Sequence, residues 1–374
     1  ADGNKIVYAS DCDSTKDKYA VKVSLVDSDG TAVGTEQTNA AGSFDNLEVG
    51  KYKITATLSD GTTEKKKVEK TINIKNLDDM SAYLFVHFVD TQEDATREQI
   101  YFSVSKDGKT WTTLNNKQPY LTSNVGTQGV RDPYILRGED GKFFIIATDL
   151  SVYNLKNNWT AAAQQGSKSI VVWESSDLVN WSEASLVKIN NDNAGCTWAP
   201  EACYDPEKDE YMVFWASVVS DDSYQKYRIY RSYTKDFKTF SAPELYIEEP
   251  NAVIDTTIID HEGTYYRFTK NEAKSSITMQ ECTSLSGDWK DVANYNLGSM
   301  TGYEGPTIYK LNGKNEWCLL LDYFSKSKGY KPFVTTDITK GEFTADSDFS
   351  FDGTYRHGTV MPITQAEYES LTAE

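Results

Sequence analysis

The sequence has 374 residues, of which 39% are hydrophobic and 13% aromatic, and it carries a formal net charge of −18. Its length is sufficient for two or three domains with hydrophobic cores of their own. A surface this acidic repels nucleic acid and anionic lipid, so neither is expected as a partner. No apolar run reaches 18 residues, so membrane insertion is not expected either.

The residue content favours an all-β protein. Tyr, Thr and Val are frequent, and a Leu/Ala/Glu-rich periodic segment is seen only in the last dozen residues. The five cysteines show no metal-ligand spacing, and their odd number prevents complete pairing. Cys196 and Cys203 could meet if the chain turns between them, and the sequence does not decide whether they form a disulfide.

A small β-sandwich domain is predicted over residues 1–78. Its alternating strands are separated by turn signals that contain Gly. The predicted strands are Tyr19–Val26, Tyr52–Leu58 and Lys67–Ile74. The segment Gly42–Tyr52 resembles bacterial immunoglobulin-like or prealbumin-like modules, which implies a spacer or adhesion unit, with a carbohydrate-binding module as the alternative. Residues 75–79 are the predicted linker.

Residues 79–374 contain a long repeat. Five short strand-like runs open on motifs with an ionisable residue, and successive ionisable residues are 69, 54, 49 and 53 positions apart. The motifs are Arg131-Asp132-Pro133, Trp198-Ala199-Pro200-Glu201, Val253-Ile254-Asp255, Tyr303-Glu304-Gly305-Pro306 and Arg356-His357-Gly358. Such periods are typical of stacked or radially arranged units. A second series of Ser/Thr-initiated hairpins divides each unit into four strands, and the first complete unit is predicted as Asp132–Arg137, Phe143–Thr148, Ile170–Ser175 and Ser182–Lys188.

The ends of this region predict how the fold closes. Residues 82–115 supply only three strands, and the C-terminal run His357–Ile363 supplies one strand without a unit of its own. Pairing the two ends would complete a fifth unit and remove exposed sheet edges. The sequence therefore predicts a five-bladed β-propeller over 79–374 that is closed by the C-terminal strand.

In such a fold, the starts of first strands and the ends of second strands lie at one mouth. This would bring Asp132, Glu201, Asp255, Glu304 and His357 together with Asp149, Ser217, Lys270 and Asp322. Glycoside hydrolysis needs one carboxyl group that is protonated and another that is ionised, and crowded carboxylates separate their pKa values. Each motif alone is better explained by local turn or strand conformation. Five motifs at equivalent positions favour an active site.

With these motifs in this order, residues 82–363 resemble glycoside hydrolase family 43. The resemblance implies an inverting mechanism in which Asp132 is the general base, Asp255 orients the acid and raises its pKa, and Glu304 is the general acid. Thr256 follows Asp255 where the family more often has Pro, which changes the local turn and leaves the carboxylate in place. The Asp132 and Glu304 carboxylates should then lie about 6.5–9.5 Å apart.

Further residues are expected to contact substrate. They are Asp149, Trp198, Glu201, Trp215, Lys270, Asp322 and Arg356. Glu201 has a structural role as its alternative. Trp159, Tyr303 and Tyr323 are candidates for stacking on a sugar, although each such residue is more often a packing residue. The resemblance implies that His357 contacts an axial calcium or sodium ion, commonly through water. No cofactor is required for the chemistry.

The predicted function is an exo-acting α-L-arabinofuranosidase that trims plant cell-wall polysaccharide such as xylan. A β-xylosidase, an arabinanase and a galactan-active enzyme fit the same resemblance. A non-catalytic carbohydrate-binding propeller and an adhesion scaffold are the alternatives from other classes. We expect a monomeric bacterial protein that is secreted or at the cell surface. No signal peptide is visible, and the start Ala1-Asp2-Gly3 resembles a processed end.

Overall fold

The computed structural model describes residues 6–9, 19–48, 50–60, 63–74, 80–90 and 94–373. The chain divides into two compact units. The first covers residues up to Asp78, and the second covers Asp79 to Glu374 apart from the hairpin tip Tyr204–Glu210. The predicted linker at 75–79 and the start at 1–3 lie outside the described residues. Within the described ranges, no helix is long and apolar enough to span a membrane.

The described part of the first unit contains two β-sheets around a small core. One sheet pairs β1 (Ile6–Ala9) with β3 (Ala41–Phe44), and the other has the order β2 (Ala20–Asp27), β4 (Gly50–Ser59), β5 (Glu64–Ile74). Alternate residues of β2, namely Val21, Val23 and Leu25, are buried because a strand points successive side chains to opposite faces. They pack with Phe44 and Tyr52.

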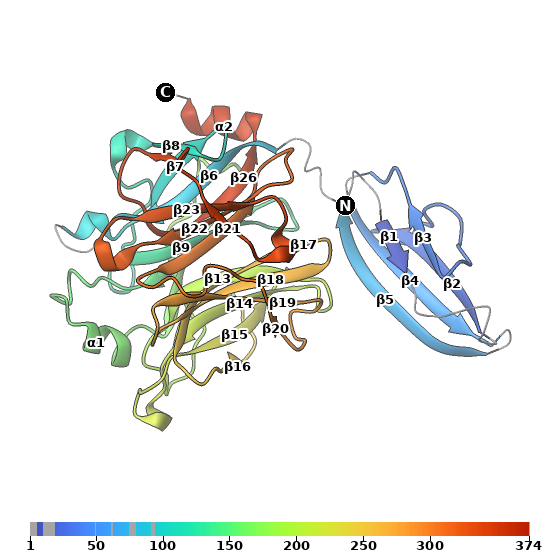
Figure 1. Cartoon of the computed structure of the whole chain (residues 1–374), viewed down its shortest axis with the longest axis horizontal. Coiled ribbons are helices and arrows are strands. Elements are labelled where there is room, and N and C mark those ends of the chain that lie inside the picture. Colours follow the sequence, from blue (N-terminus) through green and yellow to red (C-terminus); the bar gives the residue numbers. More distant parts are fainter. Residues whose placement is uncertain are drawn as a thin grey trace. The chain divides into compact units, whose positions relative to one another are not determined.

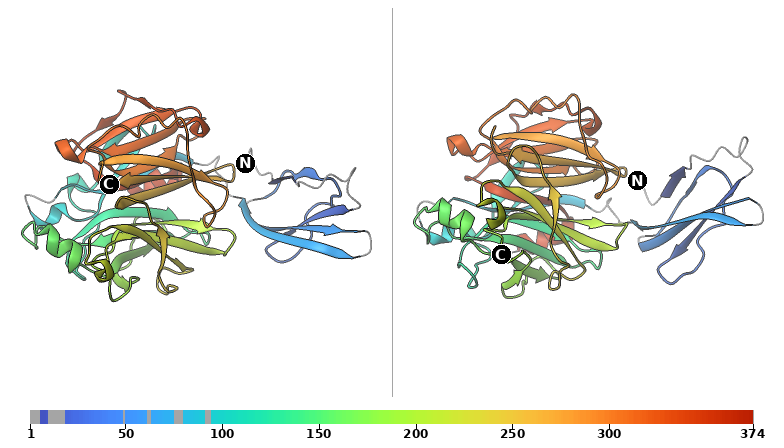
Figure 2. Two further views of the ribbon diagram at one scale, coloured as in Figure 1. Left: turned by 60° about the horizontal axis from the view of Figure 1, so that its bottom comes forward. Right: turned by 90° about the horizontal axis from the view of Figure 1, so that it is seen from below.

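The second unit contains, among its described residues, five sheets, which are built mainly from antiparallel strand pairs (Figures 1 and 2). Four of the sheets have four strands in chain order, and the fifth has five strands. The four-stranded sheets are β9 (Val130–Arg137), β10 (Phe143–Asp149), β11 (Ser169–Ser175), β12 (Ser185–Lys188); β13 (Trp198–Asp205), β14 (Glu210–Ser217), β15 (Arg228–Thr234), β16 (Glu244–Ile247); β17 (Val253–His261), β18 (Thr264–Asn271), β19 (Ser276–Cys282), β20 (Lys290–Asp291); and β21 (Glu304–Lys310), β22 (Trp317–Asp322), β23 (Tyr330–Thr335), β24 (Thr344–Ala345). The all-β class and the four strands of the first complete unit are confirmed.

The fifth sheet joins the two ends of the second unit. Its order is β25 (Ser350–Phe351), β8 (Thr110–Thr113), β7 (Tyr101–Ser105), β6 (Met80–Phe88), β26 (Arg356–Thr364). The predicted pairing of the C-terminal strand is confirmed, because β26 runs antiparallel to β6 with Val360 opposite Phe85 (Figure 1). Without this pairing, β6 would present an unpaired edge.

Helices are short in the described part of the chain. The two α-helices are α1 (Trp159–Gln164), which lies in the β10–β11 connection, and α2 (Gln365–Thr372), which follows β26. Single 3-10 turns form η1 (Ala95–Arg97), η2 (Asn115–Lys117), η3 (Ser220–Asp222), η4 (Phe324–Lys326) and η5 (Ile338–Lys340). Thr364 and Glu367 form a capping box at the start of α2.

The first strand of most sheets begins with a β-bulge. The register shifts by one residue at Asp132-Pro133, at Asp255, at Gly305-Pro306 and at His357-Gly358. Asp132, Asp255 and Gly305 have φ near +50°, a left-handed conformation that disfavours residues with a Cβ. Ala199 has the same conformation in β13, with φ of 47°.

These bulges correct the predicted alignment of the motifs. The structurally equivalent residues are Asp132, Ala199, Asp255, Gly305 and His357. Glu201 therefore lies two residues beyond the bulge position, and Glu304 lies one residue before it. The five ionisable residues therefore lie within two residues of the bulge position in their strands, but they do not all occupy that position.

Candidate active site

Three predicted site residues, Asp132, Asp255 and His357, meet at the starts of three first strands. Strand β26 contacts both β9 and β21, and β21 also contacts β17, so these strand starts converge. The Nδ1 atom of His357 lies 3.2 Å from Oδ1 of Asp132 and 3.8 Å from Oδ2 of Asp255. All three side chains are at most 13% exposed. One imidazole thus bridges two carboxylates in a nearly buried position.

Asp132 is held in its ionised form. Burial acts to raise the pKa of Asp132, but the charge and hydrogen bond of His357, the charge of Arg131 and the Thr148 hydroxyl together lower it. Thr148 Oγ1 donates to Oδ2 of Asp132 at 2.9 Å and accepts from the backbone N–H of Ala199 at 2.8 Å. The carboxylate is therefore both charged and fixed in orientation, as a general base requires.

Asp255 is in a different electrostatic environment. Its Oδ2 accepts a hydrogen bond of 3.1 Å from the backbone N–H of Gly305. Burial raises the pKa of Asp255 to about 6, the charges of Glu304 and Asp132 add to the effect, and His357 and Lys270 oppose it. Two neighbouring aspartates therefore have pKa values shifted in opposite directions.

Glu304 lies between two cations at the start of β21. Its Oε2 is 3.0 Å from Lys270 Nζ and its Oε1 is 3.2 Å from Arg356 Nη2. The side chain is 20% exposed, more than Asp132, Asp255 or His357. Among the predicted catalytic carboxylates it is the one most open to a ligand.

The two cations beside Glu304 are themselves anchored by acidic groups. Lys270 is 3% exposed and also pairs with Glu272 at 2.8 Å, while Arg356 Nε lies 2.5 Å from Oδ2 of the fully buried Asp322. Burial raises the pKa of Asp322, and the Arg356 charge opposes this. Lys270 and Asp322 have almost no exposed surface and support Glu304 and Arg356, and their contact with substrate stays a prediction.

His357 fits an ion-pair role better than a metal-binding role. Burial would lower the pKa of His357, but the charges of Asp255, Asp132 and Glu201 and the hydrogen bond to Asp132 raise it to about 10. A protonated imidazole has no lone pair for a cation. No group of three or more His, Cys, Asp or Glu side chains in the described ranges is arranged to hold a metal ion. The described side chains therefore do not offer a direct ligand set for the axial ion, and the contact through water that the resemblance implies stays a prediction.

Glu201 is buried beside this cluster. It is 5% exposed, and its Oε2 has no hydrogen-bond partner among the described residues. Burial raises the pKa of Glu201 to about 8, so the carboxyl group is largely protonated at neutral pH. A neutral carboxylic acid is a proton donor in such a site.

Other predicted contacts lie elsewhere or are already engaged. Trp215 has no exposed surface, so it is a packing residue and the prediction of substrate contact is wrong for it. Asp149 is 4% exposed and accepts hydrogen bonds from the Thr127 N–H and hydroxyl, which fixes the loop before β9. Trp198 is half-buried and stacks on Tyr227 with ring centroids 5.3 Å apart.

Sequence reasoning missed two supporting residues, Glu98 and Thr148. Glu98 is fully buried and accepts from Arg131 Nη1 at 3.0 Å, which fixes the residue next to Asp132. Thr148, which bonds Asp132, lies at the end of β10, where the strand-end rule had selected only its neighbour Asp149. A Glu directly before a strand-like run was the only sequence signal for Glu98.

No disulfide joins Cys196 to Cys203, so the pairing that the sequence left open is not formed.

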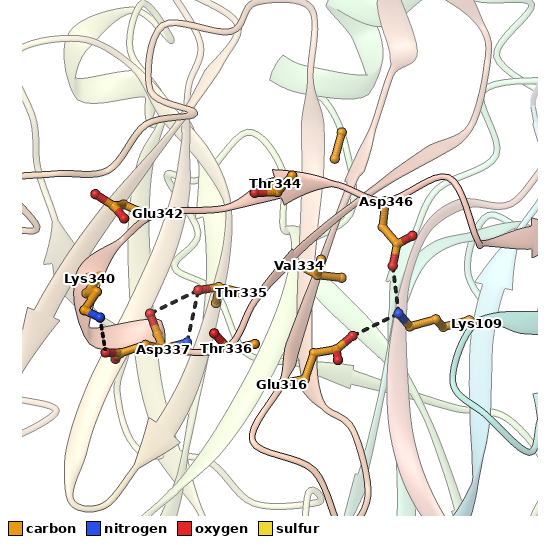
Figure 3. A pocket seen from close by; sticks show the side chains of 11 residues that line it. Lys109, Glu316, Val334, Thr335, Thr336, Asp337, Lys340, Glu342, Thr344 and Asp346 are labelled. Atoms are coloured by element: carbon orange, nitrogen blue, oxygen red, sulfur yellow. Dashed lines mark hydrogen bonds and ion pairs between the residues drawn. The ribbon is translucent and has the colours of Figure 1, made fainter.

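A separate cavity contains none of the predicted site residues. The cavity, of about 520 Å³, is lined by residues of the β23–β24 region together with Lys109, which pairs with Glu316 and Asp346 (Figure 3). The candidate active site is the carboxylate cluster, because it combines converging strand starts with opposed pKa shifts.

Comparisons with known proteins agree on a carbohydrate-active family. Residues 78–369 match the family model described as a probable glycosyl hydrolase domain, which is related to family 43. A curated alpha-L-arabinofuranosidase of Bifidobacterium longum subsp. longum is 30% identical over 385 residues, covering 89% of this chain and 35% of that protein. The chain therefore spans about a third of the length of this relative.

Several solved structures are similar at low identity. A thermostable family-43 glycoside hydrolase is 19% identical with a TM-score of 0.45, covering 63% of this chain and 77% of that chain. A family-43 protein of Bacillus licheniformis is 17% identical with a TM-score of 0.47, covering 76% of this chain and 55% of that chain. An exo-beta-1,3-galactanase of Phanerochaete chrysosporium is 17% identical with a TM-score of 0.45, covering 60% of this chain and 53% of that chain. TM-scores below 0.5 do not establish a shared fold. The family match covers most of the chain, and the chain belongs to the family of glycosyl hydrolase domains related to glycoside hydrolase family 43.

Proposed function

We propose that this chain is an inverting glycoside hydrolase that acts on plant cell-wall polysaccharide as an exo-acting α-L-arabinofuranosidase. The observation that supports the chemistry is the contrast between Asp132, whose pKa is lowered, and nearby carboxyl groups whose pKa values are raised by burial. The support for the sugar is the 30% identity to an alpha-L-arabinofuranosidase. Beta-xylosidase, arabinanase and galactan-active specificities remain the alternatives.

The proposed reaction is a single displacement. Asp132 takes a proton from a water molecule while the water oxygen forms a bond to the anomeric carbon. The glycosidic C–O bond breaks, and Glu304 gives its proton to the departing oxygen, so the configuration is inverted. Asp255 and His357 hold these groups in place. This requires a separation of about 6.5–9.5 Å between the Asp132 and Glu304 carboxylates.

The finer architecture belongs to the same proposal. We propose that the five sheets are the blades of a β-propeller and that residues 1–78 form an immunoglobulin-like or prealbumin-like sandwich. Support comes from the four-stranded sheets in chain order and from the β6–β26 pairing. A secreted or cell-surface monomer is the form that suits a polymeric substrate outside the cell.

Glu201 is a second candidate for the general acid. Its carboxyl group has a pKa near 8, whereas the Glu304 carboxylate contacts two cations. Its burial, at 5% exposed, makes direct contact with a leaving group harder. The two assignments can be distinguished by experiment. Replacing the general acid, whether it is Glu304 or Glu201, should leave most of the activity on a substrate whose leaving group needs no protonation.

The test compares Glu304→Gln with Glu201→Gln on aryl α-L-arabinofuranosides of graded leaving-group ability. Removal of the acid should lower kcat/KM on arabino-oligosaccharide by about 10²–10⁴-fold and leave most of the activity on a dinitrophenyl glycoside, which needs no protonation. We expect this pattern for Glu304→Gln, because Glu304 is more exposed than Glu201. The same pattern for Glu201→Gln alone would reassign the acid.

Proton NMR of the first product gives an independent control. A product of inverted configuration supports the single displacement. A retained configuration, or a wild-type protein inactive on arabinosides, xylosides and galactosides alike, would contradict the proposed function.

A further inference from the structure

A partly exposed tryptophan lies close to the groups that hold Asp132. Trp159, the first residue of α1, is 46% exposed. Its ring makes an edge-to-face contact with Trp198 at 6.2 Å, and the Arg131 guanidinium lies 5.3 Å from its centroid. A single exposed apolar side chain needs no explanation, but this one is held by two neighbours.

Both neighbours are linked to Asp132. Arg131 precedes Asp132 in β9. Trp198 precedes Ala199, whose N–H bonds the same Thr148 hydroxyl that donates to Asp132. The aromatic surface is therefore connected to the general-base position by two separate routes. We call Trp159, Trp198 and Arg131 the aromatic platform.

The loop that carries Trp159 is firmly supported. The buried carboxylate of Glu98 accepts hydrogen bonds from the Ser151 hydroxyl and from the N–H groups of Val152 and Tyr153, each at 3.0 Å. The same carboxylate pairs with Arg131. One fully buried group thus fixes both the loop and the cation beneath the tryptophan, and Asn158 caps α1. A preorganised aromatic ring loses little entropy when a ligand stacks on it.

We propose that Trp159 is a specificity-determining residue that stacks on a sugar ring of the substrate other than the ring at whose anomeric carbon the bond is cleaved. This rests on the proposed function and extends it to the length of the substrate. A sugar presents a flat C–H face that packs on an aromatic ring. The chain's net charge of −18 favours a neutral ligand over an anionic one. Because the platform adjoins Asp132 but is more exposed, the ring that it contacts is beyond the buried site.

The experiment compares substrates with one and with several sugar rings. Trp159→Ala is assayed on arabinotriose and on arabinofuranosyl fluoride, whose leaving group is a single atom. We expect kcat/KM on the trisaccharide to fall at least tenfold, mostly through KM, and the loss on the fluoride to be at least fivefold smaller. Trp159→Phe should recover part of the trisaccharide activity because it keeps an aromatic face.

A matched control and a binding measurement keep the inference separate from the proposed function. Leu186→Ala removes a side chain of similar exposure, 44%, on β12 and should change neither activity. Calorimetric binding of arabinotriose, xylotriose and β-1,3-galactotriose to Glu304→Gln, with and without Trp159→Ala, needs no turnover. At least one trisaccharide should bind about tenfold more weakly without Trp159.

The outcomes are distinct. Equal losses on trisaccharide and fluoride, or unchanged binding of all three trisaccharides, would overturn the inference and leave the proposed function standing. An inactive wild-type protein that still binds a trisaccharide through Trp159 would overturn the proposed function alone. A change in oligomeric state on Trp159→Ala with unchanged binding would assign the surface to contact between copies of the chain.

Discussion

At the scale of single residues, the site is a set of carboxylates whose ionisation depends on a few buried cations. Lys270 is one of them, since its charge opposes the burial that raises the pKa of Asp255 to about 6. Replacing Lys270 with Met removes that charge and leaves a side chain of similar length. The pKa of Asp255 should then rise further.

The pH profile of kcat/KM reports this change because it follows ionisations of the free enzyme. If ionised Asp255 is needed for activity, activity is lost as the pH falls through its pKa. Lys270→Met should therefore move the acidic limb to higher pH by about one unit. Lys270→Arg should restore its position, and the exposed Lys274→Met should not move it. An unmoved limb in Lys270→Met would show that Asp255 does not control it.

The identity of these carboxylates was accessible from the sequence, and their environments were not. Motif order was enough to select Asp132, Asp255 and Glu304. Which of them contacts a cation depends on residues distant in sequence, such as Lys270 beside Glu304 and His357 beside Asp132. Trp215 is an expected substrate contact, and only the three-dimensional packing shows that its side chain is fully buried.

At the scale of elements, local turn chemistry explains where the strands begin and end. The strand-to-turn motifs Ser105-x-Asp107, Ser175-x-Asp177 and Thr234-x-Asp236 each place a hydroxyl and a carboxylate on backbone N–H groups of the same turn. Such motifs are readable from sequence. The bulges at Asp132 and Gly305 are not, because a one-residue shift depends on pairing with another strand, and the predicted alignment of Glu201 and Glu304 was therefore displaced.

One hairpin turn offers a stability test. The turn between β17 and β18 has φ of 53° at Glu262 and 83° at Gly263. Two positive φ values are typical of a type I′ turn, for which Asn-Gly is preferred. Glu262→Asn should stabilise the second unit by about 0.5–1 kcal/mol, because Asn tolerates the left-handed conformation better than Glu.

Thermal unfolding followed by circular dichroism measures this effect. A gain of that size corresponds to a rise in Tm of about 2 °C for a unit of this length. Glu262→Ala is the matched control: it also removes the carboxylate, but it gains no left-handed preference and should leave Tm unchanged. If both variants raise Tm equally, the gain comes from removing charge and not from the turn.

At the scale of the whole second unit, the pairing of β26 with β6 determines whether β6 has an unpaired edge. Val360, Met361 and Ile363 of β26 are buried, and burying three such side chains contributes roughly 5–9 kcal/mol. This is comparable to the total stability of a typical domain. The helix α2 contributes less, through Leu371 and the Arg137–Glu367 ion pair.

Two C-terminal truncations separate these contributions. Removal of residues 365–374 deletes α2 and keeps Arg356 and His357, so we expect a folded protein that retains activity with a Tm lower by several degrees. Removal of residues 356–374 also exposes the edge of β6 and the apolar side chains that β26 covered, so we expect aggregation during expression. Gel filtration and circular dichroism distinguish the two results. If the protein without residues 356–374 is monomeric and gives the β-sheet spectrum of the full chain, β6 does not need β26 as its partner. Strand β26 would then serve only to place Arg356 and His357 in the site.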